Sequence, residues 1–415
     1  MKPELTPHSA LRQNGGDASS PIAKAASSLQ ILLILSALMS FASISTDLYL
    51  PAIPAMGADL HADTGRVELT ISGYLVGFSL GQLWWGPFGD RFGRRLPIGL
   101  GLILFIVGSA GCALATSVDM MIGWRALQAL GACASVVQSR AMVRDLHTGQ
   151  QAARMMSTLM TVMAVAPLVG PFAGGLILHL ASWRAIFWTQ LGIGIATLYA
   201  LHRLPETLPA ERRSQTSILE ALIDYGALLR QRRLLGYLGV GGCFYGGMFA
   251  YIAGTPFAYI SYYDVSPQHY GFLFGLGIVG IMLSNQINIR LLCRFGVVRL
   301  MRAGVIGAAL AGGLLASNAH SGWGGLAGLV IPLFMFVAMT GFIVANSIAG
   351  ALAANPERAG AVSALVGMSQ YGTGILGSAL VGYWADGTPW PMGCVIAIFG
   401  AGGLLCAYLL VTGKK

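Results

Sequence analysis

Two charged residues stand inside apolar stretches that are long enough to cross a membrane. Asp47 lies in the stretch 29–51 and Arg125 in the stretch 119–140, whereas we place the other acids in tails, in loops or at helix ends. A charge at membrane depth costs at least about 2.5 kcal/mol, so each is a candidate functional residue. A carboxyl group whose charge depends on burial and on a nearby arginine suits a proton carrier. We expect the two side chains to face one another or a shared aqueous cavity; the alternative is a fixed structural ion pair.

A second group of residues could form the wall of a substrate cavity. Arg125 and Gln128 are one helical turn apart, so they share a face and could both bind a polar group of a ligand. Aromatic, polar and flexible apolar side chains of other spans complete the candidates: Tyr49, Met160, Met163, Tyr245, Phe249, Gln370 and Tyr371. The alternative for the aromatic residues and the methionines is core packing or lipid contact.

Glycine and charge are concentrated in the segment Gly86 to Arg95, between two long apolar stretches. Glycines allow tight backbone geometry, a carboxylate can face a helix N-terminus, and arginines hold a turn on the cytoplasmic side.

The predicted span 155–179 contains Gly170, Pro171 and Gly174. Proline removes an intrahelical hydrogen bond and glycine permits close helix contact, so we expect a kink here that serves as a hinge. Ordinary packing of small residues is the alternative.

The composition requires a membrane to hold these elements. The chain has 415 residues, of which 55% are hydrophobic and 10% charged, whereas soluble domains have about 25% charged residues. We predict an all-α integral membrane protein with twelve transmembrane helices in two six-helix bundles. The predicted spans are 29–51, 69–89, 96–116, 119–140, 155–179, 183–203, 234–257, 270–290, 299–317, 324–350, 360–384 and 391–412.

The basic residues indicate the orientation and exclude several functions. They gather in the tails and the even-numbered loops, and only Arg66 and Arg184 fall in odd-numbered ones, so both termini are expected in the cytoplasm. The net charge of +9 therefore does not indicate nucleic-acid binding. No cysteine pair has metal-ligand spacing, no phosphate-binding glycine loop is present and no nucleophile–base motif stands out. We expect no metal, no cofactor and no enzymatic activity.

The chain divides into four parts. We predict a disordered cytoplasmic tail over 1–28, a bundle over 29–203, a cytoplasmic linker over 204–233 with a surface helix near its end, and a second bundle with a short tail over 234–415. A faint repeat supports the halves, since Arg91-Phe92-Gly93 recurs as Arg294-Phe295-Gly296.

Several motifs resemble those of a transporter family. The loop Gly86 to Arg95 resembles the signature loop between helices two and three of the major facilitator superfamily, Gly123 to Gly131 its helix-four arginine motif, and Gly170-Pro171 with Gly174 its antiporter motif. Thr46 to Pro54 is similar to the first-helix signature of the bicyclomycin-resistance (Bcr/CflA) group of drug:proton antiporters. The segments Pro205 to Pro209, Gly247 to Phe249 and Gly254 to Phe257 also resemble that group.

The resemblance implies roles for these residues. Asp47 would bind protons and cationic substrates, Arg125 would regulate it, and Gly170 with Pro171 would form the bend that limits leak. Asp90 would contact the region 360–363. Arg94 would pair with Asp145. Together these contacts would form a conformational latch that stabilises the outward-facing state. The latch residues are Gly86, Asp90, Arg91, Gly93, Arg94, Arg95 and Asp145. Cys293 stands where Asp90 would repeat, so we expect only the first-half latch to switch.

The function expected from these features is proton-coupled efflux of amphipathic drugs across the bacterial inner membrane by alternating access. The partners would be a small-molecule substrate, protons and the lipid bilayer, with the chain as a monomer. Two alternatives are a proton-coupled transporter of a metabolite, such as an amino acid or a sugar, and a passive facilitator. A receptor without transport is disfavoured because the polar insertions are too short for a signalling domain.

Overall fold

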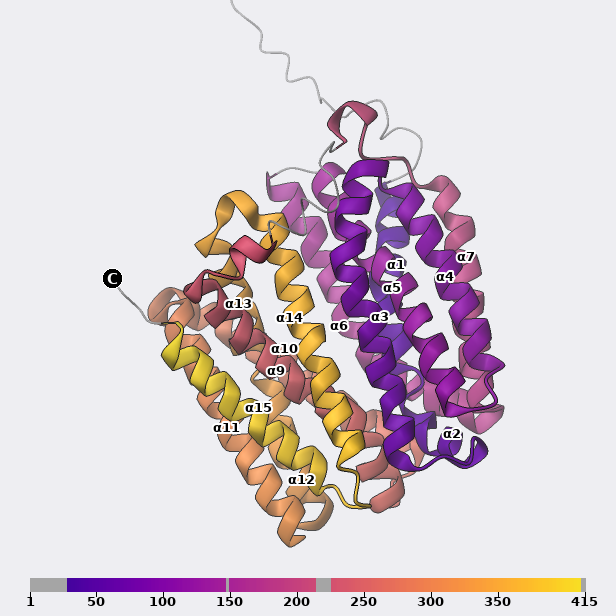
Figure 1. The fold of residues 1–415 in the computed structure, drawn as a ribbon, viewed down its shortest axis with the longest axis vertical. Helices are drawn as coiled ribbons and strands as arrows, with labels where there is room; N and C mark the ends of the chain where they lie inside the picture. Colours follow the sequence, from indigo (N-terminus) through magenta and orange to yellow (C-terminus); the bar gives the residue numbers. More distant parts are fainter. Residues whose placement is uncertain (1–27, 147–148, 214–224, 412–415) are drawn as a thin grey trace, which may run out of the picture.

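The structure, a computed structural model, describes residues 28–146, 149–213 and 225–411; the side chains of a further few residues, most of them in 149–164, are also outside this description. The predicted tail thus lies outside the described residues except for its last position, as does most of the predicted linker helix. Each predicted span has a helical counterpart (Figure 1).

The helices of the first half are α1 (Ser28–Asp47), α2 (Ile53–Asp59), α3 (Thr64–Phe92), α4 (Arg95–Ala113), α5 (Val118–Leu146), α6 (Gly149–Leu180) and α7 (Trp183–Ala200). The helices of the second half are α9 (Arg232–Pro256), α10 (Pro267–Phe295), α11 (Val297–Ser321), α12 (Gly325–Ala338), α13 (Thr340–Ala354), α14 (Ala359–Tyr383) and α15 (Trp390–Leu409). α12 and α13 together replace one predicted span, which is interrupted at Met339.

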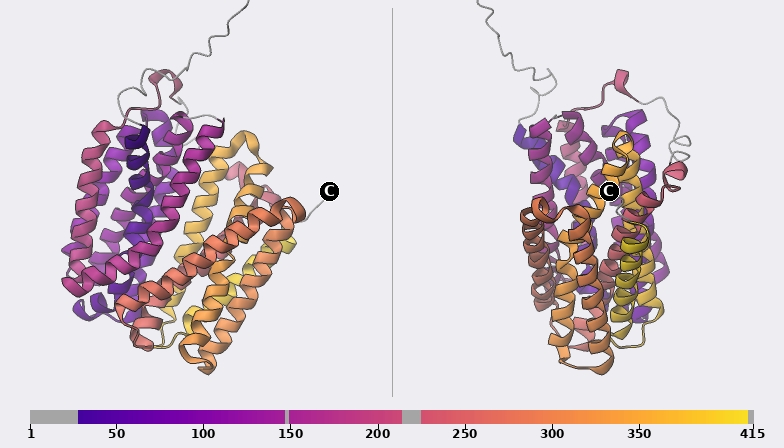
Figure 2. Two further views of the ribbon diagram at one scale, coloured as in Figure 1. Left: turned by 180° about the vertical axis from the view of Figure 1, so that it is seen from behind. Right: turned by 90° about the vertical axis from the view of Figure 1, so that its left-hand side faces the viewer.

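The helices form two groups that lie side by side, drawn in purple to magenta and in rose to yellow (Figure 1). The groups meet where α3 packs on α14 and where α6 packs on α10; Figure 2 shows the α6–α10 side from behind. We call the end that carries the residues after α7 the linker end, and the opposite end, with the turn between α2 and α3, the far end.

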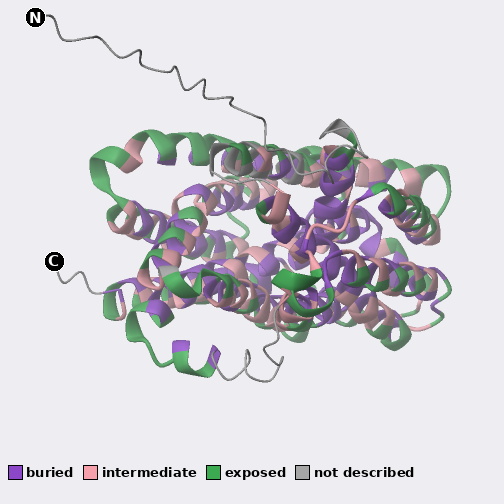
Figure 3. Cartoon of the chain, turned by 90° about the horizontal axis from the view of Figure 1, so that it is seen from above, coloured by how far each residue is buried: buried purple, intermediate pink, exposed green. Residues whose placement is uncertain are grey.

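Membrane embedding is evident in the outer faces. Within the described residues, nine helical stretches are long and apolar enough to span a membrane. Seen from above, exposed positions lie on the outside of the groups (Figure 3), and many carry large apolar side chains, among them Leu80, Leu100, Ile289, Leu310 and Leu405. Exposed apolar belts of this kind suit contact with lipid.

α3 and α14 are not among these nine stretches. They pack on each other between the groups, and glycines and serines form their contact. Gly65 lies against Gly382, and the hydroxyl groups of Ser72 and Ser378 are 2.8 Å apart. Small residues let two helix backbones approach closely, which explains why α3 and α14 have fewer large apolar side chains. We call this contact, formed by Gly65 with Gly382 and by Ser72 with Ser378, the seam.

Candidate functional site

The first predicted span is broken at Asp47. α1 ends at this residue, a 3-10 turn follows over Leu50–Ala52, and α2 continues to the far end. The predicted continuous helix over 29–51 is therefore wrong at its end. Pro51 and Pro54 stand at the start of the two short helices, where proline lacks an N–H that could extend the hydrogen bonds of α1. A helix that ends inside a protein leaves backbone carbonyls in need of donors.

Arg125 and Gln190 supply those donors. The Arg125 side chain is fully buried, and its Nη1 donates to the carbonyl of Ser45 over 2.9 Å. Gln190 Nε2 donates to the carbonyl of Ile44 over 3.2 Å. A cation at the C-terminal end of a helix also offsets the negative end of the helix dipole. Arg125 therefore stabilises the break in α1 from the neighbouring α5.

Aromatic rings, and not Asp47, surround the Arg125 guanidinium. Its Cζ lies 4.1 Å from the ring centre of Tyr49, 4.4 Å from that of Tyr74 and 5.9 Å from that of Phe187. Contacts of this kind contribute about 2 kcal/mol or more when desolvated. Among the ion pairs of the described residues there is none between Arg125 and Asp47, so a direct ion pair is not formed. Arg125 Nε and Nη2 have no hydrogen-bond partner.

Gln128 orients the arginine through a buried network within the first group. Its Oε1 accepts from Arg125 Nη1 over 2.6 Å, and its Nε2 donates to Ser109 Oγ and to Gln190 Oε1, each over 2.7 Å. The amide is thus fully used inside the protein. The shared helix face with Arg125 is as expected, but Gln128 bonds to α4 and α7 and presents no free amide atom to a ligand.

Asp47 lies against the predicted hinge. Its side chain is 5% exposed, and Oδ1 accepts a hydrogen bond from Thr46 Oγ1 over 3.1 Å. A Cβ atom at Gly170 would lie 2.8 Å from the Asp47 Cβ, and one at Gly174 would meet the carbonyl of Leu48. The glycines of α6 therefore permit this helix to pack directly on the break in α1. The structure brings together two motifs that the sequence analysis derived separately.

The aromatic candidates gather where the groups meet. The ring of Tyr371 lies 4.4 Å from that of Phe78, 5.8 Å from that of Phe249 and 6.1 Å from that of Tyr245. Gln370 is buried beside them, and its Nε2 has no hydrogen-bond partner. The other two candidates, Met160 and Met163, belong to α6, but their side chains lie outside the described residues.

Two further charged residues lie at the estimated edges of predicted spans: Arg140, which was not predicted as a site residue, and Glu68, which was expected as a loop acid near the outer face that could assist the proton step. Arg140 of α5 ends a predicted span, yet its guanidinium interacts electrostatically with Tyr245 and Tyr371, and its Nε has no partner. Glu68 was placed outside the span 69–89, but α3 begins at Thr64 and the side chain of Glu68 is 2% exposed. In both cases the signal was a charge at the estimated edge of a span, where the boundary itself is uncertain by several residues.

The predicted latch is partly formed. Arg94 pairs with Asp145, as expected, with Nε 2.8 Å from Oδ2, and also with Asp90, with Nη1 2.7 Å from Oδ1. Asp90 does not bond to the start of α14; Gly360 and Ser363 there are exposed, and Ser363 Oγ donates within its own helix to Ala359. The half of the latch that would bridge the two groups is therefore not engaged in this structure.

Of three other latch residues, Arg91 and Arg95 make local contacts and Gly86 faces open space. The guanidinium of Arg91 lies over the ring of Phe92, 5.6 Å from its centre. A Cβ atom at Gly86 would meet nothing within 4 Å. Arg95 is involved through its backbone N–H, which donates to Glu206.

Glu206 ties the linker to this loop. Its carboxylate accepts from the backbone N–H groups of Arg94 (2.9 Å), Arg95 (3.1 Å) and Leu208 (3.0 Å), so it caps the N-terminus of α4. Burial alone would raise the pKa of Glu206, but these N–H groups hold it below its usual value. Thr207 Oγ1 donates to Asp145 Oδ2 over 3.1 Å. Neither contact was predicted from the sequence.

Residues 33–378 match the model of the Major Facilitator Superfamily. This chain belongs to that superfamily. It is therefore a multi-pass membrane transporter, and the predicted all-α fold of this superfamily is confirmed.

The relatives within the superfamily include proteins named for drug resistance. The chain is 37% identical over 394 residues to the uncharacterized MFS-type transporter YdgK of Bacillus subtilis, covering 93% of this chain and 96% of that protein. It is 30% identical to the bicyclomycin resistance protein homolog of Haemophilus influenzae, covering 87% and 91%. It is also 30% identical to a chloramphenicol resistance protein of Pseudomonas aeruginosa, covering 87% and 86%.

Solved structures support the superfamily fold. The partially occluded inward open conformation of the xylose transporter XylE from E. coli superposes with a TM-score of 0.69, over 93% of this chain and 99% of that one. The sequence identity is 16%, so this likeness concerns the fold alone.

Proposed function

We propose that this superfamily member exports amphipathic drugs from the bacterial cytoplasm in exchange for protons, by alternating access across the inner membrane. Relatives named for bicyclomycin and chloramphenicol resistance support the substrate class. The tyrosine and phenylalanine rings between the two groups support it too, since such surfaces accommodate varied apolar shapes.

The observation that carries the proposal is the buried carboxyl of Asp47 at the break in α1. It has no cationic partner among the described residues, and Thr46 is the donor to it. An unpaired buried carboxylate costs free energy, so this arrangement favours the protonated form. Water or a cationic substrate near the same group favours the ionised form. Binding of a substrate then promotes release of the proton, which couples the two movements.

Arg125 positions this carboxyl. It holds the end of α1 through the Ser45 carbonyl, while its charge is shared with the rings of Tyr49 and Tyr74. An arginine that is not neutralised by Asp47 leaves the carboxyl free to exchange its proton. We propose that loss of Arg125 disturbs coupling by shifting the break.

The contacts between the groups support an inward-facing arrangement. At the far end, a Cβ atom at Gly175 of α6 would lie 2.8 Å from the carbonyl of Pro267 in α10, and the rings of Phe172 and Phe272 are 5.7 Å apart. At the linker end, Asp90 is half-exposed and unbound to α14. The positive-inside pattern assigns the linker end and both termini to the cytoplasm. We treat the monomer as the transporting unit.

The first test is drug susceptibility of an efflux-deficient bacterium that expresses this chain or Asp47→Asn. The panel is bicyclomycin, phenicols, sulfonamides, fluoroquinolones and cationic dyes. We expect resistance to at least one compound, lost in Asp47→Asn at equal expression. Asp119→Asn is the matched control, because this acid lies on the surface at the far end and pairs with Arg66. Resistance that survives Asp47→Asn would contradict the assigned coupling site.

A second test separates exchange from passive movement and from uptake. In proteoliposomes loaded with the compound that the panel identifies, we expect transport to follow an imposed pH gradient and to reverse with it. Transport that ignores the gradient would identify a facilitator. Absence of any drug effect despite membrane expression would instead favour a metabolite as substrate.

A further inference from the structure

A second acid is buried between the two groups of helices, at the far end. Glu68 lies in the second turn of α3, on the side that packs against α14. A Cβ atom at Gly382 of α14 would lie 3.5 Å from the Cβ of Glu68 and 2.7 Å from the carbonyl oxygen of Gly65. Glu68 is buried, with 2% of its surface exposed.

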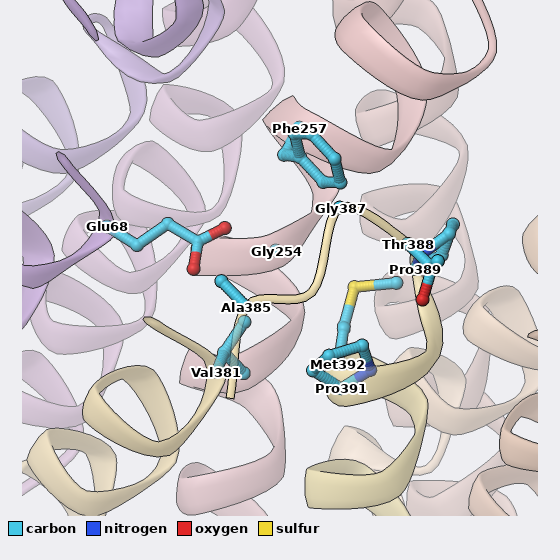
Figure 4. A pocket seen from close by; sticks show the side chains of 10 residues that line it. All are labelled: Glu68, Gly254, Phe257, Val381, Ala385, Gly387, Thr388, Pro389, Pro391 and Met392. Atoms are coloured by element: carbon cyan, nitrogen blue, oxygen red, sulfur yellow. The ribbon is translucent and has the colours of Figure 1, made fainter. Parts of the chain in front are cut away.

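The carboxyl of Glu68 points into a pocket that the second group of helices completes. The pocket is small, with a volume of about 20 Å³, which is room for about one water molecule. Figure 4 shows Glu68 reaching from α3 toward Gly254 of α9 and Ala385, which follows α14. The opposite wall is apolar, with Phe257 and Met392. Glu68 Oε2 has no hydrogen-bond partner.

Charged groups of the surrounding elements are engaged elsewhere. Arg66 pairs with Asp119 of α5 over 2.6 Å, and Arg184 pairs with Asp59 of α2 over 2.5 Å. Other titratable residues near this end are bonded elsewhere or exposed. Asp63 accepts from the Arg66 N–H, Asp386 accepts from Thr388, and His269 Nδ1 is hydrogen-bonded to Ser266 Oγ. The ring centre of Tyr259 lies 6.1 Å from that of Tyr270, and exposed positions include His61, Asp264 and Tyr383. In the described part of the chain, no cation lies within ion-pair distance of Glu68.

These observations give the carboxyl two very different environments. In the closed arrangement it is buried and has no cationic partner among the described residues, so its ionised form carries a large desolvation cost. If the groups separate at the far end, the seam formed by Gly65 with Gly382 and by Ser72 with Ser378 must open, and water reaches the carboxyl. Ionisation then costs little.

We propose that Glu68 is a second proton-binding residue of this transporter, whose protonation is required for the two groups to close at the far end. The proposal rests on alternating access as proposed above, but not on Asp47 being the coupling site. Because linkage is reciprocal, a proton that favours closure is bound more tightly by the closed arrangement. A proton taken up from the far side by Glu68 therefore drives the change toward the inward-facing state, and Glu68 joins Asp47 as a second acid in the cycle.

The test measures the separation of the two groups at the far end as a function of pH. Spin labels are placed at Leu114→Cys and Trp323→Cys, two exposed positions in different groups, in the full chain with its native cysteines replaced and reconstituted in lipid nanodiscs. With Glu68 intact, we expect the distance to lengthen from acid to alkaline pH. Glu68→Gln, which resembles the protonated form, is expected to lose this shift and stay short. Glu68→Asp is expected to retain it.

A matched control makes the result specific. Asp119→Asn removes a surface acid at the same end, which pairs with Arg66, and is expected to keep the pH-dependent shift. A shift of unchanged size in Glu68→Gln, or no shift in the unsubstituted chain, would overturn the proposal. If Glu68→Gln proves unstable, Glu68→Asp provides the test, and loss of the pH-dependent shift in Glu68→Asp would overturn the proposal.

The two proposals fail in different ways. Drug resistance that survives Asp47→Asn, together with a shift abolished only by Glu68→Gln, refutes coupling at Asp47 and supports Glu68. Resistance lost in Asp47→Asn, together with an undiminished shift in Glu68→Gln, supports coupling at Asp47 and refutes the role proposed for Glu68.

Discussion

The turns after α3 and after α10 have the same backbone shape but different chemistry. Gly93 directly follows α3 with φ of 92°, and Gly296 directly follows α10 with φ of 75°. In each turn an arginine, Arg91 or Arg294, stacks on the phenylalanine that follows it, with Cζ 5.6 and 5.4 Å from the ring centre. The faint repeat seen in the sequence thus corresponds to a repeated structure.

Only the first turn carries a network of ion pairs among the described residues. Arg94 joins two acids there, whereas the corresponding residue of the second turn is Val297 and the residue corresponding to Asp90 is Cys293. The backbone turn therefore belongs to the fold of each half, and the charges are an addition to one half. The second turn serves as an internal control for the first.

The largest expected effect comes from removing the shared cation. Arg94→Ala leaves Asp145, which is 17% exposed, without its ion pair, and breaking a buried pair costs about 3 kcal/mol. Arg294→Ala is expected to change stability by less than about 0.5 kcal/mol, because it is exposed. Thermal unfolding of the purified variants measures both. Equal losses would show that the two turns depend on their arginines alike.

The backbone shape is tested by placing alanine at each turn glycine. Gly93→Ala and Gly296→Ala each place an alanine in a region of φ and ψ that is nearly restricted to glycine. Each substitution is expected to lower the free energy of unfolding by about 2 kcal/mol. Gly93→Ala is expected to lose more, since its Cβ would lie 2.7 Å from Glu206 Oε2, while a Cβ at Gly296 meets nothing within 4 Å. Melting temperatures in the opposite order would contradict this account.

A smaller, pH-dependent effect is expected from Glu206→Gln. The pKa of Glu206 is lowered in the folded protein by its backbone hydrogen bonds despite its burial, so its ionised form stabilises the fold above its unfolded pKa, and this stabilisation is lost as the pH falls through the folded pKa. At neutral pH the variant should lose about 1 kcal/mol, as for loss of a helix cap. Melting curves of both proteins should converge in acid; a difference that is constant with pH would refute the capping role.

The smallest effect is expected when the first turn's charges are copied into the second. Cys293→Asp with Val297→Arg creates a pair four residues apart, which contributes about 0.3 kcal/mol on an exposed helix end. The double variant lacks counterparts of Asp145 and Glu206. A gain comparable to the loss in Arg94→Ala would show that the local pair alone accounts for the network.

The helices were largely predictable because burial in lipid depends on composition over a long stretch. Their ends were less so. α3 and α10 begin and end beyond the predicted spans 69–89 and 270–290, since polar and charged residues continue a helix past the apolar region that defines a span. The break of α1 at Asp47 was missed because an apolar stretch continues through it and its cause, contact with α5 and α6, is not local.

The site residues were predictable by type, but their partners were not. A charge in an apolar stretch identifies Asp47 and Arg125, yet helical spacing does not reveal that Tyr49 and Tyr74 enclose the arginine. The glycines of α6 were identified as a hinge without any indication that they touch Asp47. Glu68 could be named from the sequence as an acid at the edge of a span, but its burial depends on α14, a helix far away in the sequence, so the pattern around Glu68 does not show that it is buried.

The seam between α3 and α14 also constrains how the protein is made. α3 leaves the ribosome long before α14, and neither has the apolar character of the nine stretches that suit lipid on their own. Until the eleventh span arrives, the small and polar face of α3, with Glu68 on it, has no protein cover. A chain truncated before α14 should therefore remain open to membrane quality-control proteases, and two halves synthesised as separate chains should persist only when both are present.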